Sequence, residues 1–451
     1  MSNQEQLVIG LAGLGTVGGG LMEMLRENEA DILNRTGRCI RVKTIAVRDL
    51  NKTRALPEGA TLTDDPLSLA SDPEIDVVVE LMGGKDTART LIQTALRNGK
   101  HVVTANKALL AEHGEEIFTL AGERNCFLGY EASVAGAVPI VQTLRESLAG
   151  NHISSVMGIL NGTGNYILSE MTSHGLDFTT ALSQAQALGL AEADPTLDID
   201  GIDAAHKLIL LIRLAWGRHY PFSHLAVQGI RGLRRMDIEF AREFGYRIKL
   251  IGQAKEVDGR IEAGIYPALI HHTMLIARVG GAYNAVRVEG NALGSLFLHG
   301  LGAGSRPTAS AVLGDLLGIA RGAEINNTGY RQTVLPPAQI LPAEDAMTPW
   351  YVRLMVKDIS GVLRDIAGAM AEEGVSIAQV IQKAECPDGV PIVFMTHATT
   401  GRAIHAAAHK LENAGLLLEQ ATCYRVFARD PKGGETSSGA VGREPVPEAD
   451  L

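Results

Sequence analysis

Residues 7–18 read LVIGLAGLGTVG, a short apolar run followed at once by three glycines in the spacing G-x-G-x-x-G. This order predicts a buried strand, a tight turn and the start of a helix. The first glycine permits the turn, the second lets a phosphate approach the backbone, and the third lets the helix pack on the strand. The stretch predicts a dinucleotide-binding domain, with candidate contacts at Gly13, Leu14, Gly15, Thr16, Val17 and Gly18.

Further apolar segments continue the pattern of a parallel sheet. Residues 40–47, 75–80 and 100–104 are short and rich in valine and isoleucine, and residues 86–98 have a helical pattern. One more strand is expected at 127–130. The N-terminal third is therefore predicted to be a doubly wound α/β domain of the Rossmann type.

The residue after the second predicted strand bears on the choice of cofactor. An NAD enzyme would carry an acid there to reach the ribose hydroxyls, whereas this chain has Arg48, which can meet a 2′-phosphate. NADP(H) is favoured over NAD(H), although the neighbouring Asp49 keeps NAD(H) possible.

Two further positions lie where parallel strands should end. Lys107 follows the strand at 100–104. Ligands of open α/β sheets bind outside the carboxyl ends of the strands, so Lys107 is a candidate to contact a ligand. The alternative is that Lys107 is a surface lysine at the start of a helix. Glu131 precedes the small residues 132–140. A carboxylate with free backbone carbonyls suits a hard cation, but a glycine-rich connection fits the spacing equally well.

The stretch 185–207, AQALGLAEADPTLDIDGIDAAHK, carries five acidic residues ahead of a single lysine, Lys207. Asp203 and Lys207 are four residues apart and share one face of a helix. The apolar run 208–216 predicts that this helix is buried. Such a loop could hold a substrate ammonium group beside a lysine that moves a proton, or be a solvated acidic loop with an ordinary ion pair.

Composition narrows the class of protein. A length of 451 residues suits two or three domains, and a net charge of -10 argues against nucleic acid or an anionic membrane as the main partner. The four cysteines form no C-x-x-C pair, which argues against a zinc site or a disulfide framework. No apolar run is long enough to cross a bilayer, and the polar start lacks the features of a signal peptide. We expect a cytoplasmic enzyme.

The middle of the chain has a different pattern. Residues 136–299 are expected to form a mixed α+β domain that binds substrate and dimerises, with a hairpin over 246–269 that turns at Asp258–Gly259. Asn161 and its neighbours offer polar donors or form a simple turn. Residues 300–309, GLGAGSRPTA, form a second glycine-rich turn, which leads into a helix over 309–320.

The C-terminal part follows a proline-rich linker over 335–342. Strands and helices between 351 and 427 are predicted in the order βαββαβ, a small ferredoxin-like unit. The last strand is expected at 417–427. The tail from residue 430 lacks apolar periodicity and is predicted to be disordered.

One family shares these motifs in this order. The acidic stretch resembles the signature of homoserine dehydrogenases, and residues 104–111, TANKALLA, resemble the same family. The matching signature positions are Ala185, Gly189, Leu190, Asp194, Pro195, Asp198, Gly201, Asp203 and Lys207.

The resemblance implies NAD(P)H-dependent, reversible reduction of aspartate 4-semialdehyde to homoserine, on the route to threonine, methionine and isoleucine. Lys207 would donate the proton and Asp203 would position it. The substrate-binding positions would be Gly189, Glu192, Asp198, Asp203 and Lys107. Lys107 and Gly304 would also touch the cofactor.

The resemblance further implies a monovalent cation, usually Na⁺, and a C-terminal ACT domain. The cation positions would be Glu131, Val134, Gly136 and Val138. The first turn of the ACT domain would be matched by Asp358, Gly361, Val362 and Leu363. The resemblance also implies feedback inhibition by threonine through the ACT domain; the alternative is that this domain is a purely structural dimerisation unit. A homodimer or homotetramer built through the middle domain would follow as well.

The expected domain plan can be stated by residue number. It comprises a dinucleotide-binding domain at 1–135 completed by 300–325, a substrate and dimerisation domain at 136–299, a linker at 326–349, an ACT domain at 350–428 and a tail at 429–451. Two other functions remain open. One is a non-catalytic protein that senses NADPH and amino acids, and the other is an acylating semialdehyde dehydrogenase, which would need a reactive cysteine.

Overall fold

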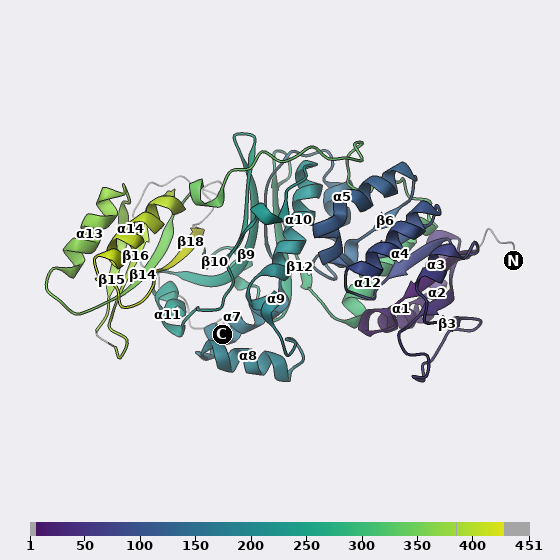
Figure 1. The fold of residues 1–451 in the computed structure, drawn as a ribbon, viewed down its shortest axis with the longest axis horizontal. Coiled ribbons are helices and arrows are strands. Elements are labelled where there is room, and N and C mark those ends of the chain that lie inside the picture. The colour runs from purple at the N-terminus through teal and green to yellow at the C-terminus, as the bar shows by residue number, and fades with distance from the viewer. Residues whose placement is uncertain (1–5, 385, 428–451) are drawn as a thin grey trace.

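The computed structural model describes residues 6–384 and 386–427, so the tail predicted to be disordered lies outside the described residues. The molecule is elongated (Figure 1). The parallel-sheet part lies at one end with the N-terminus, a middle part surrounds the long strands β9 and β10, and a smaller unit with α13 and α14 lies at the other end.

The first part is a six-stranded parallel sheet in the order β3-β2-β1-β4-β5-β6. Its strands are β1 Gln6–Ala12, β2 Cys39–Ala46, β3 Thr61–Thr63, β4 Val77–Glu80, β5 His101–Thr104 and β6 Leu128–Gly129. Its helices are α1 Thr16–Glu27, α2 Glu29–Thr36, α3 Leu67–Ser71, α4 Asp86–Arg97 and α5 Lys107–Glu123. The order reverses between β1 and β4, as in dinucleotide-binding domains, and this confirms the predicted α/β fold.

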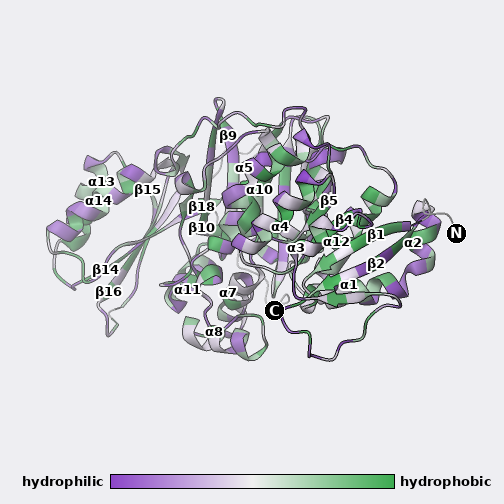
Figure 2. Ribbon diagram, turned by 45° about the vertical axis from the view of Figure 1, so that its right-hand side comes forward, coloured by the Kyte–Doolittle hydropathy of each residue, from purple (hydrophilic) through white to green (hydrophobic). Residues whose placement is uncertain are grey.

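The glycine-rich turn is held by close backbone contacts. Gly13 has a φ of 101°, and a Cβ on Gly18 would lie 2.3 Å from the carbonyl oxygen of Gly13. No other residue fits either position without moving the backbone. The apolar strands behind the turn are green in Figure 2, between helices with one hydrophobic face.

The chain returns to this part at α12, Ser305–Ala320. The Ser305 hydroxyl donates to the carbonyl oxygen of Thr16 at 2.7 Å, which ties the start of α12 to the start of α1. The helix begins earlier than the predicted residue 309, because Gly304 with a φ of 121° lets the chain turn directly into it.

The middle part contains long antiparallel strands covered by helices. Its strands are β7 Ile153–Ile159, β8 Ala226–Val227, β9 Tyr246–Val257, β10 Arg260–His271, β11 Tyr283–Gly290 and β12 Gly294–Leu301. Its helical segments are η2 Glu131–Ser133, α6 Ile140–Gln142, η3 Thr143–Ser147, α7 Gly162–His174, α8 Phe178–Ala187, α9 Thr196–Ile199, α10 Ile202–Trp216, η4 Phe222–His224, α11 Arg235–Glu243 and η5 Leu275–Arg278. The β9–β10 turn falls at Asp258–Gly259 as predicted, with positive φ at both residues.

The C-terminal unit extends the same sheet. Its elements are η6 Ala343–Asp345, β13 Met347–Thr348, β14 Trp350–Val356, α13 Val362–Glu372, β15 Ile377–Gln382, β16 Val390–Thr396, β17 Thr399–Thr400, α14 Gly401–Asn413 and β18 Thr422–Phe427. Strand β18 pairs with β14 on one side and, in parallel, with β10 on the other. The sheet therefore runs without a break in the order β12-β11-β7-β9-β10-β18-β14-β16-β15.

Buried ion pairs join the C-terminal unit to the middle part. The Arg353 Nε atom on β14 donates to Asp237 on α11 at 2.7 Å, and the Tyr351 hydroxyl donates to the same carboxylate at 2.8 Å. Asp237 is fully buried and the Arg353 side chain is 2% exposed. A second pair joins Arg425 on β18 to Glu262 on β10.

The predicted linker at 326–349 is bonded to the nucleotide-binding part and to the middle part, and its last residues form η6 and β13 of the C-terminal unit. The Asn327 side chain accepts from the Leu128 N–H at 2.8 Å, and the Ile261 N–H donates to the Gln339 carbonyl at 2.7 Å. Within the described residues, no helix has both the length and the apolar content needed to cross a membrane.

We expect Arg353→Met to lower the free energy of unfolding by about 3–5 kcal/mol, because it leaves the buried Asp237 carboxylate without its cation. Denaturant titration followed by circular dichroism measures this change. The matched control is Arg402→Met, since Arg402 is 62% exposed and pairs with surface acids, and it should leave the unfolding midpoint nearly unchanged. Equal effects of the two substitutions would contradict the prediction.

Candidate active site

Helix α10 brings the two central residues of the acidic stretch together. Asp203 and Lys207 lie one turn apart in its first half, and both are buried, with exposed fractions of 9% and 8%. The apolar residues that follow are buried on all sides, so the start of the helix is fixed in the core. The predicted shared helix face is confirmed.

The Lys207 ammonium group has two acceptors. Its Nζ atom donates to the Leu160 carbonyl at 2.6 Å and to Asp203 Oδ2 at 2.8 Å. Burial lowers the pKa of Lys207 from 10.5, while the Asp203 carboxylate acts to raise it. The ammonium group is thus oriented from the end of β7 and made more acidic than a lysine in water.

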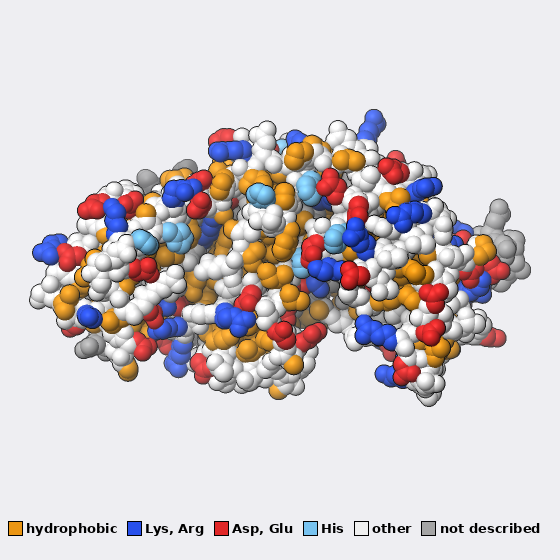
Figure 3. All heavy atoms as spheres, in the orientation of Figure 1, with side chains coloured by type: hydrophobic (Ala, Val, Ile, Leu, Met, Phe, Trp, Pro, Cys, Tyr) orange, Lys and Arg blue, Asp and Glu red, His pale blue; other side chains and the backbone are white. Residues whose placement is uncertain are grey.

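Asp203 connects the two parts of the molecule. Its Oδ1 atom lies 3.2 Å from the Nζ atom of Lys107, which comes from the start of α5 just after strand β5. Burial alone would raise the pKa of Asp203, but the two lysine ammonium groups outweigh it and hold that pKa well below its usual range. Figure 3 shows charged side chains of both signs gathering beside a hollow where the two parts meet.

Asn161 bridges the acids and also caps a helix. Its Nδ2 atom donates to Asp203 at 2.8 Å and to Asp198 at 2.7 Å, and its Oδ1 atom accepts from the Gly164 N–H at the start of α7. The sequence left a polar donor and a simple turn open at this position, whereas the structure commits the donor group to two acids and begins α7 directly after Asn161. Burial raises the pKa of Asp198.

Two predicted substrate positions lie in an exposed loop outside this cluster. Gly189 is exposed with a φ of 70°, and Glu192 is exposed with no hydrogen bond to its carboxylate among the described residues. The loop is tied to α7, because the Thr163 hydroxyl donates to the Leu190 carbonyl at 2.7 Å.

Sequence reasoning missed a second contact between α5 and α10. The His206 Nε2 atom lies 3.4 Å from Glu112, which also binds Lys85 at 2.8 Å, and the imidazole stacks on Phe222. Burial lowers the pKa of His206. These residues are far apart in the chain and share no motif, so only the pairing of the helices brings them together.

The glycine-rich turn fits a dinucleotide pyrophosphate. A Cβ on Gly15 would meet nothing within 4 Å, so the space outside the turn is open to a ligand. No side chain caps α1 at Gly15, and the N–H groups of its first turn stay available to phosphate oxygens. Gly304 and Thr16 lie on the two segments that the Ser305 hydrogen bond joins.

Arg48 and Asp49 follow strand β2 and lie at the surface. Arg48 has no hydrogen-bond or ion-pair partner among the described residues. The Asp49 carboxylate instead accepts from the Asn51 N–H at 2.9 Å and closes a local turn, which Arg54 secures by donating to the Asp49 carbonyl.

The segment after β6 presents backbone oxygens. The Glu131 carboxylate accepts from the N–H groups of Val141 and Gln142 at 2.9 and 2.8 Å, so it caps α6. The buried carbonyl oxygens of Val134 and Gly136 accept no hydrogen bond from the described residues. Among those residues no cluster of three His, Cys, Asp or Glu side chains could hold a metal ion.

The cysteines do not suit an acylating enzyme. Burial raises the pKa of Cys126, and it raises the pKa of Cys423 to about 12, so neither is a ready thiolate. Cys39 begins β2 and Cys386 lies in the β15–β16 loop, in neither case at the Lys207 cluster. The arrangement around Lys207 suits proton transfer, and the Asp203–Lys107 ion pair joins it to the part that carries the dinucleotide cradle.

Two sequence-family models match consecutive parts of the chain. The model described as "Homoserine dehydrogenase, NAD binding domain" matches residues 13–131, and the one described as "Homoserine dehydrogenase" matches residues 139–317.

Curated relatives and solved structures agree with these matches. The homoserine dehydrogenases of Neisseria gonorrhoeae and Pseudomonas aeruginosa are 45% and 44% identical, each over 90% of this chain and over 94% and 95% of their own lengths. A homoserine dehydrogenase structure from Thiobacillus denitrificans is 44% identical with a TM-score of 0.89, covering 94% of this chain and 98% of that chain. A hyperthermophilic archaeal homoserine dehydrogenase in complex with NADPH is 27% identical with a TM-score of 0.59, covering 71% of this chain and 100% of that chain. The chain therefore belongs to the homoserine dehydrogenase family of oxidoreductases.

Proposed function

We propose that this chain reduces L-aspartate 4-semialdehyde to L-homoserine with Lys207 as the proton donor. The observation that carries the proposal is the buried Lys207 ammonium group, held by Asp203 and the Leu160 carbonyl at the junction of the two parts. When bound, the nicotinamide supplies a hydride to the aldehyde carbon. The oxygen then needs a proton, which Lys207 Nζ donates, and in reverse the neutral amine accepts it.

The neighbours of Lys207 keep its proton transferable. Asp203 stays ionised and holds the amine in place whether or not it carries the proton. Lys107 adds a positive charge on the opposite side of Asp203, beside the developing alkoxide. Burial removes water that would compete for the proton.

The substrate's ammonium group would face the acidic loop. Asp198, held by Asn161, offers a half-buried carboxylate beside the cluster, and Glu192 with the Gly189 backbone offers exposed acceptors in the loop before α9. The substrate carries one positive charge there, which matches the surplus of acids in 192–203.

NADP(H) is the proposed cofactor, with NAD(H) as the alternative. Arg48 is exposed and without a partner, as a 2′-phosphate ligand requires, and the Asp49 carboxylate is turned into its own loop.

A monovalent cation, Na⁺, is proposed beside the segment after β6. The unpaired buried carbonyls of Val134 and Gly136 support it, because a hard cation satisfies such oxygens. The Val138 carbonyl differs from them, since it already accepts from the Ile140 N–H at 2.8 Å. The Glu131 carboxylate is committed to α6, so it would contribute charge or its own carbonyl.

The C-terminal unit is proposed to be an ACT domain that binds threonine. The element order β14, α13, β15, β16, α14, β18 and the antiparallel pairing order β18-β14-β16-β15 support the ferredoxin-like assignment. Its direct pairing with β10 offers a route from effector to middle domain. We propose a homodimer or homotetramer.

Lys207→Ala should lower kcat for NADPH-dependent reduction by at least ~100-fold, the low end of general acid–base contributions, without changing NADPH affinity. Lys207→Arg should lose as much, because a guanidinium keeps the charge but does not release its proton. Stopped-flow absorbance measures turnover, and fluorescence titration measures affinity. Activity retained in either variant rules Lys207 out, and NADPH binding without wild-type turnover would favour the sensor function.

Asp203→Asn should move the pH profile of the reduction to lower pH. Reduction needs protonated Lys207, so its rate falls as pH rises through the pKa of that lysine. The Asp203 carboxylate acts to raise this pKa, so removing its charge lowers the pKa and the fall begins earlier. A profile that does not move would contradict the coupling.

Arg48→Ala should raise KM for NADPH by at least ~10-fold and leave KM for NADH unchanged, because only NADPH carries the 2′-phosphate. Steady-state kinetics with both cofactors measures the effect. Arg35→Ala is the control, since Arg35 is also an exposed arginine but lies on helix α2, before the start of β2. A parallel rise in both KM values would show a general role in folding of the loop.

A further inference from the structure

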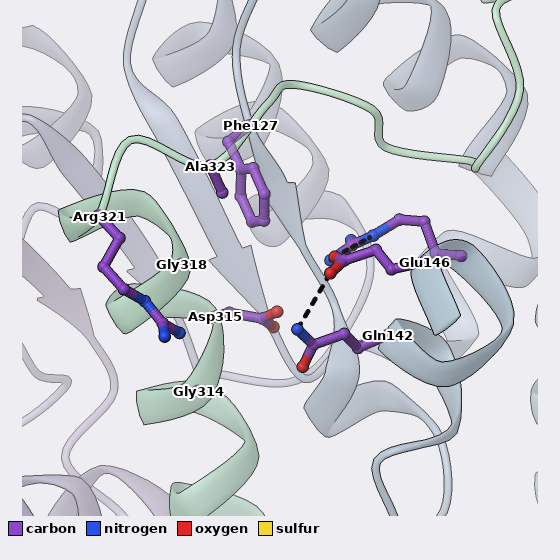
Figure 4. Close-up of a pocket in the computed structure, with 9 residues that line it drawn as sticks. Phe127, Gln142, Glu146, Gly314, Asp315, Gly318, Arg321 and Ala323 are labelled. Carbon is purple, nitrogen blue, oxygen red and sulfur yellow. Dashed lines mark hydrogen bonds and ion pairs between the residues drawn. The ribbon is translucent and has the colours of Figure 1, made fainter. Parts of the chain in front are cut away.

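A cavity of about 220 Å³ lies between α12 and the segment η3, and it shares no lining residue with the site around Lys207 (Figure 4). Arg145 and Glu146 come from η3, and Asp315 and Arg321 come from α12 and its C-terminal end. Figure 4 shows the Asp315 carboxylate between Arg321 on one side and Gln142 and Glu146 on the other.

Arg145 leaves one buried donor without an acceptor. The residue is 7% exposed, and its Nε and Nη2 atoms donate to Glu146 at 3.2 and 2.8 Å. Its Nη1 atom is buried and has no hydrogen-bond partner among the described residues. An orphaned guanidinium donor is costly and is satisfied by an anionic oxygen of a ligand.

Asp315 leaves an acceptor free beside it. The residue is 6% exposed, and its Oδ2 atom accepts from the Glu131 N–H at 3.0 Å. Its Oδ1 atom accepts no hydrogen bond from the described residues. On the other side, Arg321 donates only to the Leu317 carbonyl and forms no ion pair with a described carboxylate.

Two glycines open the floor of the cavity. Gly314 and Gly318 lie one turn apart on α12, where glycine weakens a helix. A Cβ on Gly314 would meet nothing within 4 Å, and one on Gly318 would lie 3.9 Å from Ala323 and 4.0 Å from Phe127. The helix does not need glycine for its own packing, so the missing side chains leave room for a ligand.

We propose that this cavity binds a small α-amino acid as a zwitterion. The ligand carboxylate accepts from Arg145 Nη1 and Arg321, and the ligand ammonium group donates to Asp315 Oδ1. The volume lies below the 300 Å³ at which drug-sized sites begin, so it admits only a small molecule. A carboxylate alone leaves Asp315 without a donor, and a cation alone leaves Arg145 without an acceptor.

The cavity lies next to the first crossing of the chain, from the nucleotide-binding part to the middle part, and that crossing is bonded to the second. Asp315 holds the backbone of Glu131, whose carboxylate caps α6, and the Ala137 N–H donates to the Leu301 carbonyl at 3.0 Å. A ligand bound here therefore contacts the elements that set the relative position of the two parts.

The test is calorimetric titration at constant ionic strength with L-alanine, propionate and ethylammonium. Propionate is L-alanine without its ammonium group, and ethylammonium is L-alanine without its carboxylate. We expect L-alanine to bind at least ~10-fold more tightly than either, a factor that corresponds to about 1.4 kcal/mol. Propionate or ethylammonium binding as tightly as L-alanine would overturn the assignment to amino acids.

Two variants separate this cavity from the catalytic cleft, which neither touches. Gly314→Leu should fill the cavity and abolish the L-alanine site, and Arg145→Met should weaken it at least ~10-fold. The control is Gly368→Leu, because Gly368 is an exposed glycine on α13 whose added Cβ also meets nothing within 4 Å. L-alanine binding that is absent in the wild type, or that survives Gly314→Leu unchanged, would overturn the proposal.

Discussion

The Asp203 carboxylate is the interaction on which the site depends. It binds Lys207 from its own helix and Lys107 from the nucleotide-binding part, so one acid is shared by two lysines. Removing this anion would leave the buried Lys207 ammonium group without its counter-ion and repelled by Lys107. The same contact therefore assembles the site and fixes the approach of the two parts.

The junction around this carboxylate is narrow. The chain passes from the nucleotide-binding part to the middle part after β6 and returns between β12 and α12. A Cβ on Gly136 would lie 2.6 Å from the backbone of Gly302, so the two passages run in direct contact. Any relative motion of the parts must bend both passages together, while Asp203 and Lys107 come closer or separate.

Local patterns predicted the elements that depend on neighbours in the chain. The glycine turn at residues 13–18, the Asp258–Gly259 hairpin and the Asp203–Lys207 helix face each need only a few consecutive residues, and all three are confirmed. The hairpin of β11 and β12 also turns at a glycine, Gly294, which has a left-handed conformation.

Contacts between distant segments could not be predicted. The His206–Glu112 contact depends on how α10 packs on α5, and the commitment of the Glu131 carboxylate depends on where α6 begins. The pairing of β18 with β10 also depends on contacts between distant segments.

The edge of β10 that faces away from β9 is covered by three separate segments. They are Ile340 at Ile261, β8 at Gly264–Ile265 and β18 at Ala268–Ile270. Loss of the final strand would uncover backbone donors and acceptors beside an apolar surface, and such an open edge is a template for pairing between molecules. The last strand thus covers an edge at which chains could aggregate, in addition to completing its own unit.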